Sequence, residues 1–336
     1  MKTPSTEGTT ARRRVHPPEE SYGLEIRRTV QKLLADRPPL GDLKIINTTL
    51  KEMRAALRVF GRYRHVRKVS VFGSARTQPG DPVFRLAEEF ARRMADEGYM
   101  IITGAGPGIM EACQRGAGRE RSFGVNIRLP HEQRPNQVIA GDEKLLTFKY
   151  FFTRKLFFIK EAHAVTLFPG GFGTHDEGFE ALTLLQTGKA HPMPVVFLDR
   201  KNGTYWKTWE RYVIDHLLRQ HMIAEEDLAL FLVTQDVERA VEEITRFYRV
   251  YHSSRYVHDL YVIRLNRPLS PRAVEKLNRE FGDIVVEGKI ELREAFPEEA
   301  HDAAPKDLPR LAFRFDRIHF GRLRMLIDRV NELGAN

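Results

Sequence analysis

Cysteine is almost absent from this sequence, and long apolar runs are missing. Of 336 residues only Cys113 carries a thiol, so no disulfide can form within the chain, which fits a reducing compartment. No apolar run approaches the roughly 20 residues of a membrane-spanning helix, and the first residues lack the apolar core of a signal peptide. We therefore expect a cytoplasmic protein without a membrane partner.

Hydrophobic residues are plentiful despite the lack of long runs. They make up 42% of the chain, which is enough for a full core. A length of 336 residues is sufficient for two domains, or for one domain with sizeable additions. These values predict a soluble globular protein.

The formal net charge of +9 is concentrated near the N-terminus. Residues 1–70 hold 16 Lys or Arg against 7 Asp or Glu, so the rest of the chain is neutral on balance. Arg12-Arg13-Arg14 and the basic group from Arg62 to Lys68 have the charge to meet nucleic acid or an acidic partner. Because no nucleic-acid-binding motif accompanies them, we expect a solvated tail and helix face, and no nucleic-acid partner.

Strand-like and helix-like segments alternate over the central part of the chain. Residues 1–21 are polar and rich in Pro, Thr and Arg, which predicts a disordered basic tail, and two helices follow within residues 22–64. The next helix is well marked, with Asp81 as its cap and Pro82 in its first turn. We expect strands at 68–73, 99–103, 122–127, 163–168, 193–198 and 229–233, and helices at 108–118, 151–162, 174–187, 204–219 and 236–248.

Such alternation predicts an α/β fold, a doubly wound parallel sheet of the Rossmann-like type, over residues 65–250. After residue 250 the pattern changes to a small α+β domain, residues 251–336, with His252-Ser253-Ser254-Arg255 as the separating stretch. There we expect strands at 259–265 and 310–315, a hairpin-like stretch at 284–293, and helices at 271–281 and 319–333.

The run from Phe168 to Glu177, with the sequence FPGGFGTHDE, joins an apolar strand to a helix through a glycine-rich turn. Glycines let the backbone approach a ligand closely and turn its N–H groups toward it. The helix N-terminus adds a positive dipole, so the turn predicts a phosphate-binding site. Its members are Gly170, Gly171, Gly173 and Thr174. A carboxylate repels phosphate, and we therefore expect Glu177 to act on another part of the same substrate.

The pattern Pro-Gly-Gly-x-Gly-Thr-x-x-Glu at 169–177 resembles the Lonely Guy family of cytokinin-riboside 5′-monophosphate phosphoribohydrolases, whose bacterial relatives act as general nucleotide 5′-monophosphate nucleosidases. The similarity covers about residues 65–250. It also rests on Thr153-Arg154-Lys155, Glu180, Gly73-Ser74-Ala75, the turn from Thr103 to Ala112, and Gly124 to Ile127. The chain departs from the family at His175, where relatives usually have an apolar or small residue.

The resemblance implies hydrolysis of the N-glycosidic bond of a nucleoside 5′-monophosphate, to free base and ribose 5-phosphate, without a cofactor. It places the active-site arginine at Arg154. A carboxylate near the ribose can stabilise an oxocarbenium-like sugar and activate water, so we assign this role to Glu177. Glu180 then holds the ribose or orients Arg154. Lys155 binds substrate or pairs with a nearby acid or solvent, and His175 is either a neutral bystander or the acid for the leaving base.

A first glycine-rich turn follows the second expected strand. A dinucleotide-binding fingerprint places its glycines after the first strand, so we do not expect nicotinamide binding. Gly104, Gly106 and Gly108, together with Ser74 after the first strand, form either a second wall of the nucleotide pocket or plain structural turns.

Three functions remain open from the sequence. The first is the nucleosidase, acting as a homodimer or higher homo-oligomer, because the helix at 151–162 and the helix after the motif are too apolar to face water. The second is a non-catalytic carrier or sensor of a phosphorylated ligand, since a similar fold and motif serve molybdenum-cofactor carriers. In the third, the two ends of the chain are regulatory surfaces. The twelve histidines lack paired ligands at usable spacing, so no metal site is predicted. An older family label, lysine decarboxylase, has no physical support in the sequence.

Overall fold

The computed structural model of the protein describes residues 18–129, 134–300 and 306–335. The chain divides into two compact units, residues 1–51 and residues 52–336. The first unit contains helix α1 (Pro18–Ala35) and the beginning of α2 (Leu40–Gly61). Between them Arg37 has a positive φ of 49°, and two prolines follow that interrupt the helix. Most of the predicted tail, residues 1–21, lies outside the described residues.

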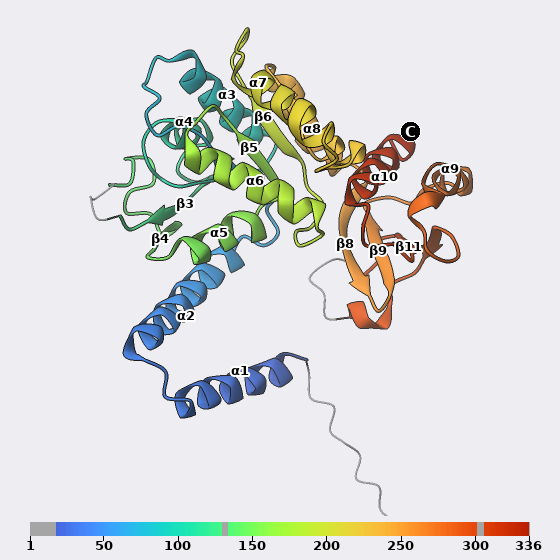
Figure 1. The fold of residues 1–336 in the computed structure, drawn as a ribbon, viewed down its shortest axis with the longest axis horizontal. Helices are drawn as coiled ribbons and strands as arrows, with labels where there is room; N and C mark the ends of the chain where they lie inside the picture. Colours follow the sequence, from blue (N-terminus) through green and yellow to red (C-terminus); the bar gives the residue numbers. More distant parts are fainter. Residues whose placement is uncertain (1–17, 130–133, 301–305, 336) are drawn as a thin grey trace, which may run out of the picture. The chain divides into compact units, whose positions relative to one another are not determined.

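A sheet of seven parallel strands forms the centre of the second unit, in the order β4-β3-β2-β1-β5-β6-β7. Figure 1 labels four of them, β3, β4, β5 and β6. The strands are β1 (Lys68–Phe72), β2 (Met100–Thr103), β3 (Ser122–Ile127), β4 (Leu145–Phe148), β5 (Ala164–Leu167), β6 (Val195–Leu198) and β7 (Leu232–Thr234). Every position of β1, β2, β3, β5 and β6 is buried, as expected for strands covered on both faces. The prediction of a doubly wound α/β sheet is confirmed.

Helices cover both faces of this sheet. One hydrophobic core includes α3 (Pro82–Asp96), α4 (Ile109–Ala117) and α8 (Val237–Phe247). The other includes the end of α2, α5 (Phe151–Lys160), α6 (Phe172–Gln186) and α7 (Tyr205–Tyr212). At the start of α3, the carboxylate of Asp81 accepts a hydrogen bond from the N–H of Val83 at 2.7 Å, which is the predicted cap. Helix α7 continues as a π-helix (Val213–Leu218), and a 3₁₀ helix (Glu225–Leu230) precedes β7.

The strand order brings the ends of β1, β2 and β5 together. The chain proceeds outwards from β1 through β2 and β3 to β4, and then returns to the opposite side of β1 at β5. In sheets of this class, the crevice at such a reversal is the usual place for a ligand. Ser74 follows β1, Gly104 follows β2 and Pro169 follows β5, so both glycine-rich turns lie at this crevice.

A second sheet of four antiparallel strands follows in sequence, in the order β10-β11-β9-β8. Its strands are β8 (Tyr251–Val257), β9 (Leu260–Leu265), β10 (Glu291–Arg293) and β11 (Arg310–Phe313). Strands β8, β9 and β11 share one hydrophobic core with α9 (Pro271–Phe281), α10 (Phe320–Leu333) and the end of α8. No helix in the described ranges combines the length and apolar character needed to cross a membrane.

Three strand predictions were wrong. The polar stretch from His252 to Arg255 is part of β8, where hydrogen bonds to β9 satisfy its backbone, so it does not separate two domains as a loop. Strand β4 was missed because, unlike the fully buried strands, it is only partly covered, and its Thr147 is exposed. The stretch 284–293 forms no hairpin of its own: 291–293 pairs with β11, and Val285 forms an isolated bridge to Phe315.

Candidate active site

A cavity of about 760 Å³ lies at the carboxyl ends of β1, β2 and β5. It brings together eight of the twelve residues that the sequence singled out as site residues, namely Ser74, Gly104, Arg154, Gly170, Gly171, Gly173, Thr174 and Glu177. Phe151, Phe172, His175, Asp176 and Tyr205 line the same cavity. Two distant glycine-rich turns and two helices therefore form one concave site.

The turn after β5 fits closely against the turn after β1. The N–H of Ser74 donates a hydrogen bond to the carbonyl of Pro169 at 3.1 Å. A Cβ atom on Gly170 would lie 2.1 Å from Oγ1 of Thr174 and 2.9 Å from the nitrogen of Ser74. Only glycine fits at position 170, because the side chain of Thr174 and the backbone of Ser74 leave no room for a Cβ atom.

Helix α6 begins directly at this turn and presents its N-terminus to the cavity. Its cap residue, Gly171, supplies no side-chain hydrogen bond. The carbonyl of Gly171 accepts from the N–H groups of Thr174 and His175, while the N–H groups of Phe172 and Gly173 precede any acceptor within the helix. Together with the helix dipole, first-turn N–H groups of this kind are able to bind an anion.

Arg154 of α5 lies across the first glycine-rich turn. Its Nε donates to the carbonyl of Val125 at 2.8 Å, and its guanidinium carbon lies 5.0 Å from the ring centroid of Phe158. A Cβ atom on Gly104 would come within 2.5 Å of its Nη2. Burial lowers the pKa of Arg154, and the charge of Glu177 opposes that shift. Because its terminal nitrogens donate to no residue in the described ranges, they can bind an anion in the cavity.

Helix α5 is held in place by Glu52, a residue that sequence reasoning missed. The two carboxylate oxygens of Glu52 accept from the N–H of Lys149 at 2.6 Å and from the hydroxyl of Thr153 at 2.5 Å. Both donors are at the start of α5. Glu52 therefore fixes the helix that presents Arg154.

Glu177 is buried one turn into α6. The residue is 5% exposed, and Oε2 has no hydrogen-bond partner among the described residues. Its Oε1 lies 3.6 Å from Nζ of Lys155, beyond hydrogen-bond distance. Burial raises the pKa of Glu177 to about 7, and the charges of Lys155 and Arg154 lower it in part. A carboxyl group with this pKa can exchange a proton near neutral pH.

Lys155 and Glu180 lie outside the cavity. Nζ of Lys155 forms ion pairs with Glu180 at 2.6 Å and with Asp176 at 2.9 Å. Glu180 thus pairs with Lys155, whereas the sequence suggested that it orients Arg154 or the ribose. Glu161, at the end of α5, pairs with Lys160 at 2.6 Å and not with Lys155. The ion pairs of Lys155 with Asp176 and Glu180 therefore link α5 to α6.

His175 lies beside Tyr205, a cavity residue that the sequence did not reveal. Nε2 of His175 is 2.7 Å from the hydroxyl of Tyr205, and that hydroxyl donates to the carbonyl of Gly170. The ring of His175 also makes an edge contact with Trp206 at 5.5 Å between centroids. Burial lowers the pKa of His175, so the imidazole is neutral at pH 7. Tyr205 and neutral His175 together hold the glycine turn.

Gly106 and Gly108 support the first turn from outside the cavity. The carbonyl of Gly106 accepts from the side chain of Asn136 at 2.9 Å. Gly108 has a positive φ of 70°, and a Cβ there would lie 2.3 Å from the carbonyl oxygen of Ser74. Of the three predicted glycines in this turn, only Gly104 lines the cavity formed by the described residues.

Comparison with protein-family models gives a match over the middle of the chain. Residues 109–244, which include Arg154 and Glu177, match the family model described as "Possible lysine decarboxylase". This is the older label of the Lonely Guy family, so the resemblance drawn from the sequence is confirmed. The comparison with curated proteins gives no match.

Solved structures with a similar fold come from several groups of proteins. The molybdenum cofactor binding protein of Rippkaea orientalis is 16% identical, with a TM-score of 0.37 over 53% of this chain and 94% of that one. The Moco carrier protein of Chlamydomonas reinhardtii is 18% identical, with a TM-score of 0.36 over 52% and 93%. DNA processing protein A of Helicobacter pylori is 15% identical, with a TM-score of 0.36 over 52% and 79%. All these scores are below 0.5, so these similarities carry no argument about function.

Proposed function

We propose, from the match of residues 109–244 to the Lonely Guy family and from the arrangement of Arg154 and Glu177, that this protein hydrolyses the N-glycosidic bond of nucleoside 5′-monophosphates. The products are a free base and ribose 5-phosphate. The observation that carries the proposal is Glu177, a buried carboxyl with one unpartnered oxygen in the same cavity as an uncapped helix N-terminus.

The N-terminus of α6 binds the substrate phosphate. The first-turn N–H groups face the cavity where Gly171 and Gly173 line it, and such N–H groups bind phosphate without a charged side chain. Arg154 adds a positive charge from the opposite turn. Since Glu177 follows one turn later in the same helix, the ribose of a bound 5′-monophosphate lies near this carboxylate.

Glu177 acts on the sugar. As the bond between C1′ and the base nitrogen breaks, its electron pair leaves with the base, and the ribose gains oxocarbenium character. An ionised Glu177 stabilises this positive charge and takes a proton from the water that adds to C1′. The departing base takes up one proton, so the overall reaction consumes one water.

A direct assay tests the proposal. The purified protein is incubated with a panel of nucleoside 5′-monophosphates and the matching nucleosides, and free base is measured by chromatography. Monophosphates should be hydrolysed and nucleosides should be poor substrates, because the helix N-terminus binds only the former. Equal turnover of adenosine and its monophosphate would count against the phosphate site.

Substitution at Glu177 separates an enzyme from a carrier of phosphorylated ligands. Glu177→Gln keeps the shape but removes the charge, so turnover should fall at least ~10²-fold while monophosphate binding, measured by calorimetry, persists. Arg154→Ala should weaken both binding and turnover. Glu180→Gln, one helical turn away and outside the cavity, is the matched control. A wild-type protein that binds monophosphates yet releases no base would establish the carrier function instead.

A further inference from the structure

Helix α2 lies outside the part of the chain that matches the family model, residues 109–244. It begins in the first compact unit and ends in the second. Its C-terminal end belongs to the same hydrophobic core as α5, through Ala56, Val59 and Phe60. One continuous helix therefore joins the N-terminal unit to the core that contains the helix of Arg154.

The N-terminus of α5 has no carboxylate of its own. Its cap residue, Tyr150, makes no side-chain hydrogen bond, and its first turn contains no Asp or Glu. The first N–H groups of any helix lack partners within the helix, and the positive end of the helix dipole attracts an acid. A carboxylate from another element can therefore stabilise the start of α5.

Glu52 of α2 supplies this carboxylate. It bridges Lys149, which precedes the cap, and Thr153, the third residue of the helix, through hydrogen bonds of 2.6 and 2.5 Å. The hydroxyl of Thr153 also lies 3.0 Å from the carbonyl of Tyr150, but its single proton favours the shorter, charge-assisted bond to Glu52. Thr153 is 1% exposed, so water competes little for this bond. The bridge therefore holds the first turn of α5 from another helix.

The first turn of α5 sets the position of Arg154. This residue follows Thr153 directly, and its N–H donates to the carbonyl of Tyr150 at 3.3 Å. Its guanidinium is held by the carbonyl of Val125 and by the ring of Phe158, and the residue lines the cavity. A guanidinium that is already in position loses less entropy on binding an anion than a mobile one does. Loosening of the first turn would therefore lower the affinity of the cavity for an anion.

Given the proposed function, we infer that Glu52 is a positioning residue for the substrate: it holds the first turn of α5 and so keeps Arg154 where the anionic group of a nucleoside 5′-monophosphate binds. Glu52 is not among the described residues that line the cavity, so it acts only through α5. Because α2 begins in the N-terminal unit, this carboxylate also connects that unit to the substrate affinity of the active site. A displacement of α2 from α5 would lower this affinity without any change in the residues of the cavity.

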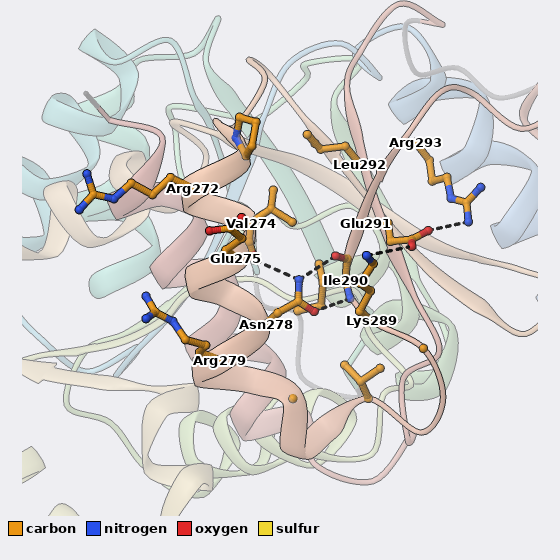
Figure 2. A pocket seen from close by; sticks show the side chains of 14 residues that line it. Arg272, Val274, Glu275, Asn278, Arg279, Lys289, Ile290, Glu291, Leu292 and Arg293 are labelled. Carbon is orange, nitrogen blue, oxygen red and sulfur yellow. Dashed lines mark hydrogen bonds and ion pairs between the residues drawn. The ribbon is translucent and has the colours of Figure 1, made fainter.

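A side-chain bridge of the same kind, away from the cavity, provides a matched control. Figure 2 shows the amide of Asn278 on α9 facing Ile290, the residue before β10. Asn278 accepts a hydrogen bond from the N–H of Ile290 at 2.8 Å and donates one to its carbonyl at 2.9 Å. Both residues line a different hollow from the candidate active site. Asn278→Ala therefore removes two hydrogen bonds between elements, as Glu52→Ala does, but leaves α5 untouched.

Calorimetry with adenosine 5′-monophosphate tests this role, in full-length proteins that all carry Glu177→Gln so that hydrolysis during the titration is slow. Adding Glu52→Ala should raise Kd roughly tenfold, the lower end of the effect of removing a support behind a metal ligand. Adding Glu52→Gln should raise Kd less, because the amide oxygen can still accept one of the two hydrogen bonds. Adding Asn278→Ala should leave Kd unchanged. Equal Kd values with and without Glu52→Ala, or equal losses from Glu52→Ala and Asn278→Ala, would overturn the inference.

A double-mutant cycle shows whether Glu52 acts through Arg154. In a protein that already carries Arg154→Ala, adding Glu52→Ala should change Kd by less than about twofold, because the guanidinium that Glu52 positions is gone. The same loss in both backgrounds would mean that Glu52 acts elsewhere and would refute the inference. Urea denaturation establishes that each variant is folded, and Glu52→Gln takes the place of Glu52→Ala in the cycle if the latter does not fold.

The outcomes separate this role from the proposed function. Monophosphate binding that is insensitive to Glu52→Ala overturns the role of Glu52 and leaves the nucleosidase proposal standing. Monophosphate binding without release of base, but with loss of affinity in Glu52→Ala, removes the nucleosidase and supports Glu52 as the residue that positions Arg154 for a carried ligand. A wild-type protein that binds no monophosphate would refute both.

Discussion

At the scale of single residues, burial of Glu177 sets the pH dependence of the proposed reaction. The base must be ionised, and its pKa is about 7. We expect kcat/KM to rise through pH 7 and level off above pH 8, falling about tenfold per pH unit below pH 6. A pH–rate profile with a 5′-monophosphate checks this. A profile that is flat between pH 5.5 and 8 would remove Glu177 from the role of base.

The same burial affects stability. The pKa of Glu177 is raised from an ordinary 4.5 to about 7, so the folded state binds the proton more tightly than the unfolded state does. The contribution of the protonated Glu177 to the free energy of unfolding is complete below pH 4.5. It is lost as pH rises to about 7, by at most roughly 3 kcal/mol. In the Glu177→Gln variant the side chain does not titrate, so this pH-dependent loss of stability is absent. Its free energy of unfolding relative to wild type should therefore increase between pH 5 and pH 8, as urea denaturation at both pH values can measure. A difference that stays constant between the two pH values would contradict this account.

At the scale of an element, the start of α6 depends on Gly170. A methyl group there would press on Thr174 and on the backbone of Ser74. Gly170→Ala should cost about 1–3 kcal/mol of stability and weaken monophosphate binding, because the turn must shift. Nothing lies within 4 Å of a Cβ on Gly173, which is helical, so Gly173→Ala should be neutral or stabilising by about 0.5–1 kcal/mol. Chemical denaturation of the two variants compares them directly, and equal destabilisation would contradict this account.

Elements with local signals were predictable from the sequence, and long-range contacts were not. The strand, turn and helix around Pro169 follow from glycine and apolar patterning within ten residues. The contact of Glu52 with Thr153 joins segments far apart in sequence and leaves no local pattern. Polar β8 resembled a loop because its pairing with β9, not its composition, stabilises it. Tyr205 was missed for the same reason as Glu52, since its hydroxyl reaches back to Gly170 through tertiary packing.

At the scale of the whole molecule, the exposed apolar residues of α5 and α6 predict self-association. Phe151 and Phe152 are 53% and 55% exposed, and Leu156 and Phe179 are 43% and 39% exposed. Burying such a patch between two copies is favourable. We expect a homodimer in sedimentation velocity at micromolar concentration, and Phe152→Glu should shift it to monomer. Ile318→Glu, at an exposed apolar residue between β11 and α10, should leave the dimer intact. A monomeric wild-type protein would refute the prediction.

The central position of β1 also has a consequence for how the chain is made. Val69 pairs with Ala164, so one edge of β1 stays unpaired until a partner about 95 residues further along the chain has been translated. At ordinary rates of synthesis this takes on the order of 10 s. During that interval the nascent chain can complete β1 to β4 but exposes an unpaired parallel edge, which is prone to misassociation. The turn that begins α6 emerges only afterwards. A nascent chain therefore cannot form the cavity at the start of α6 before its sheet has closed on β5, and a ligand of that cavity cannot assist the earlier steps of folding.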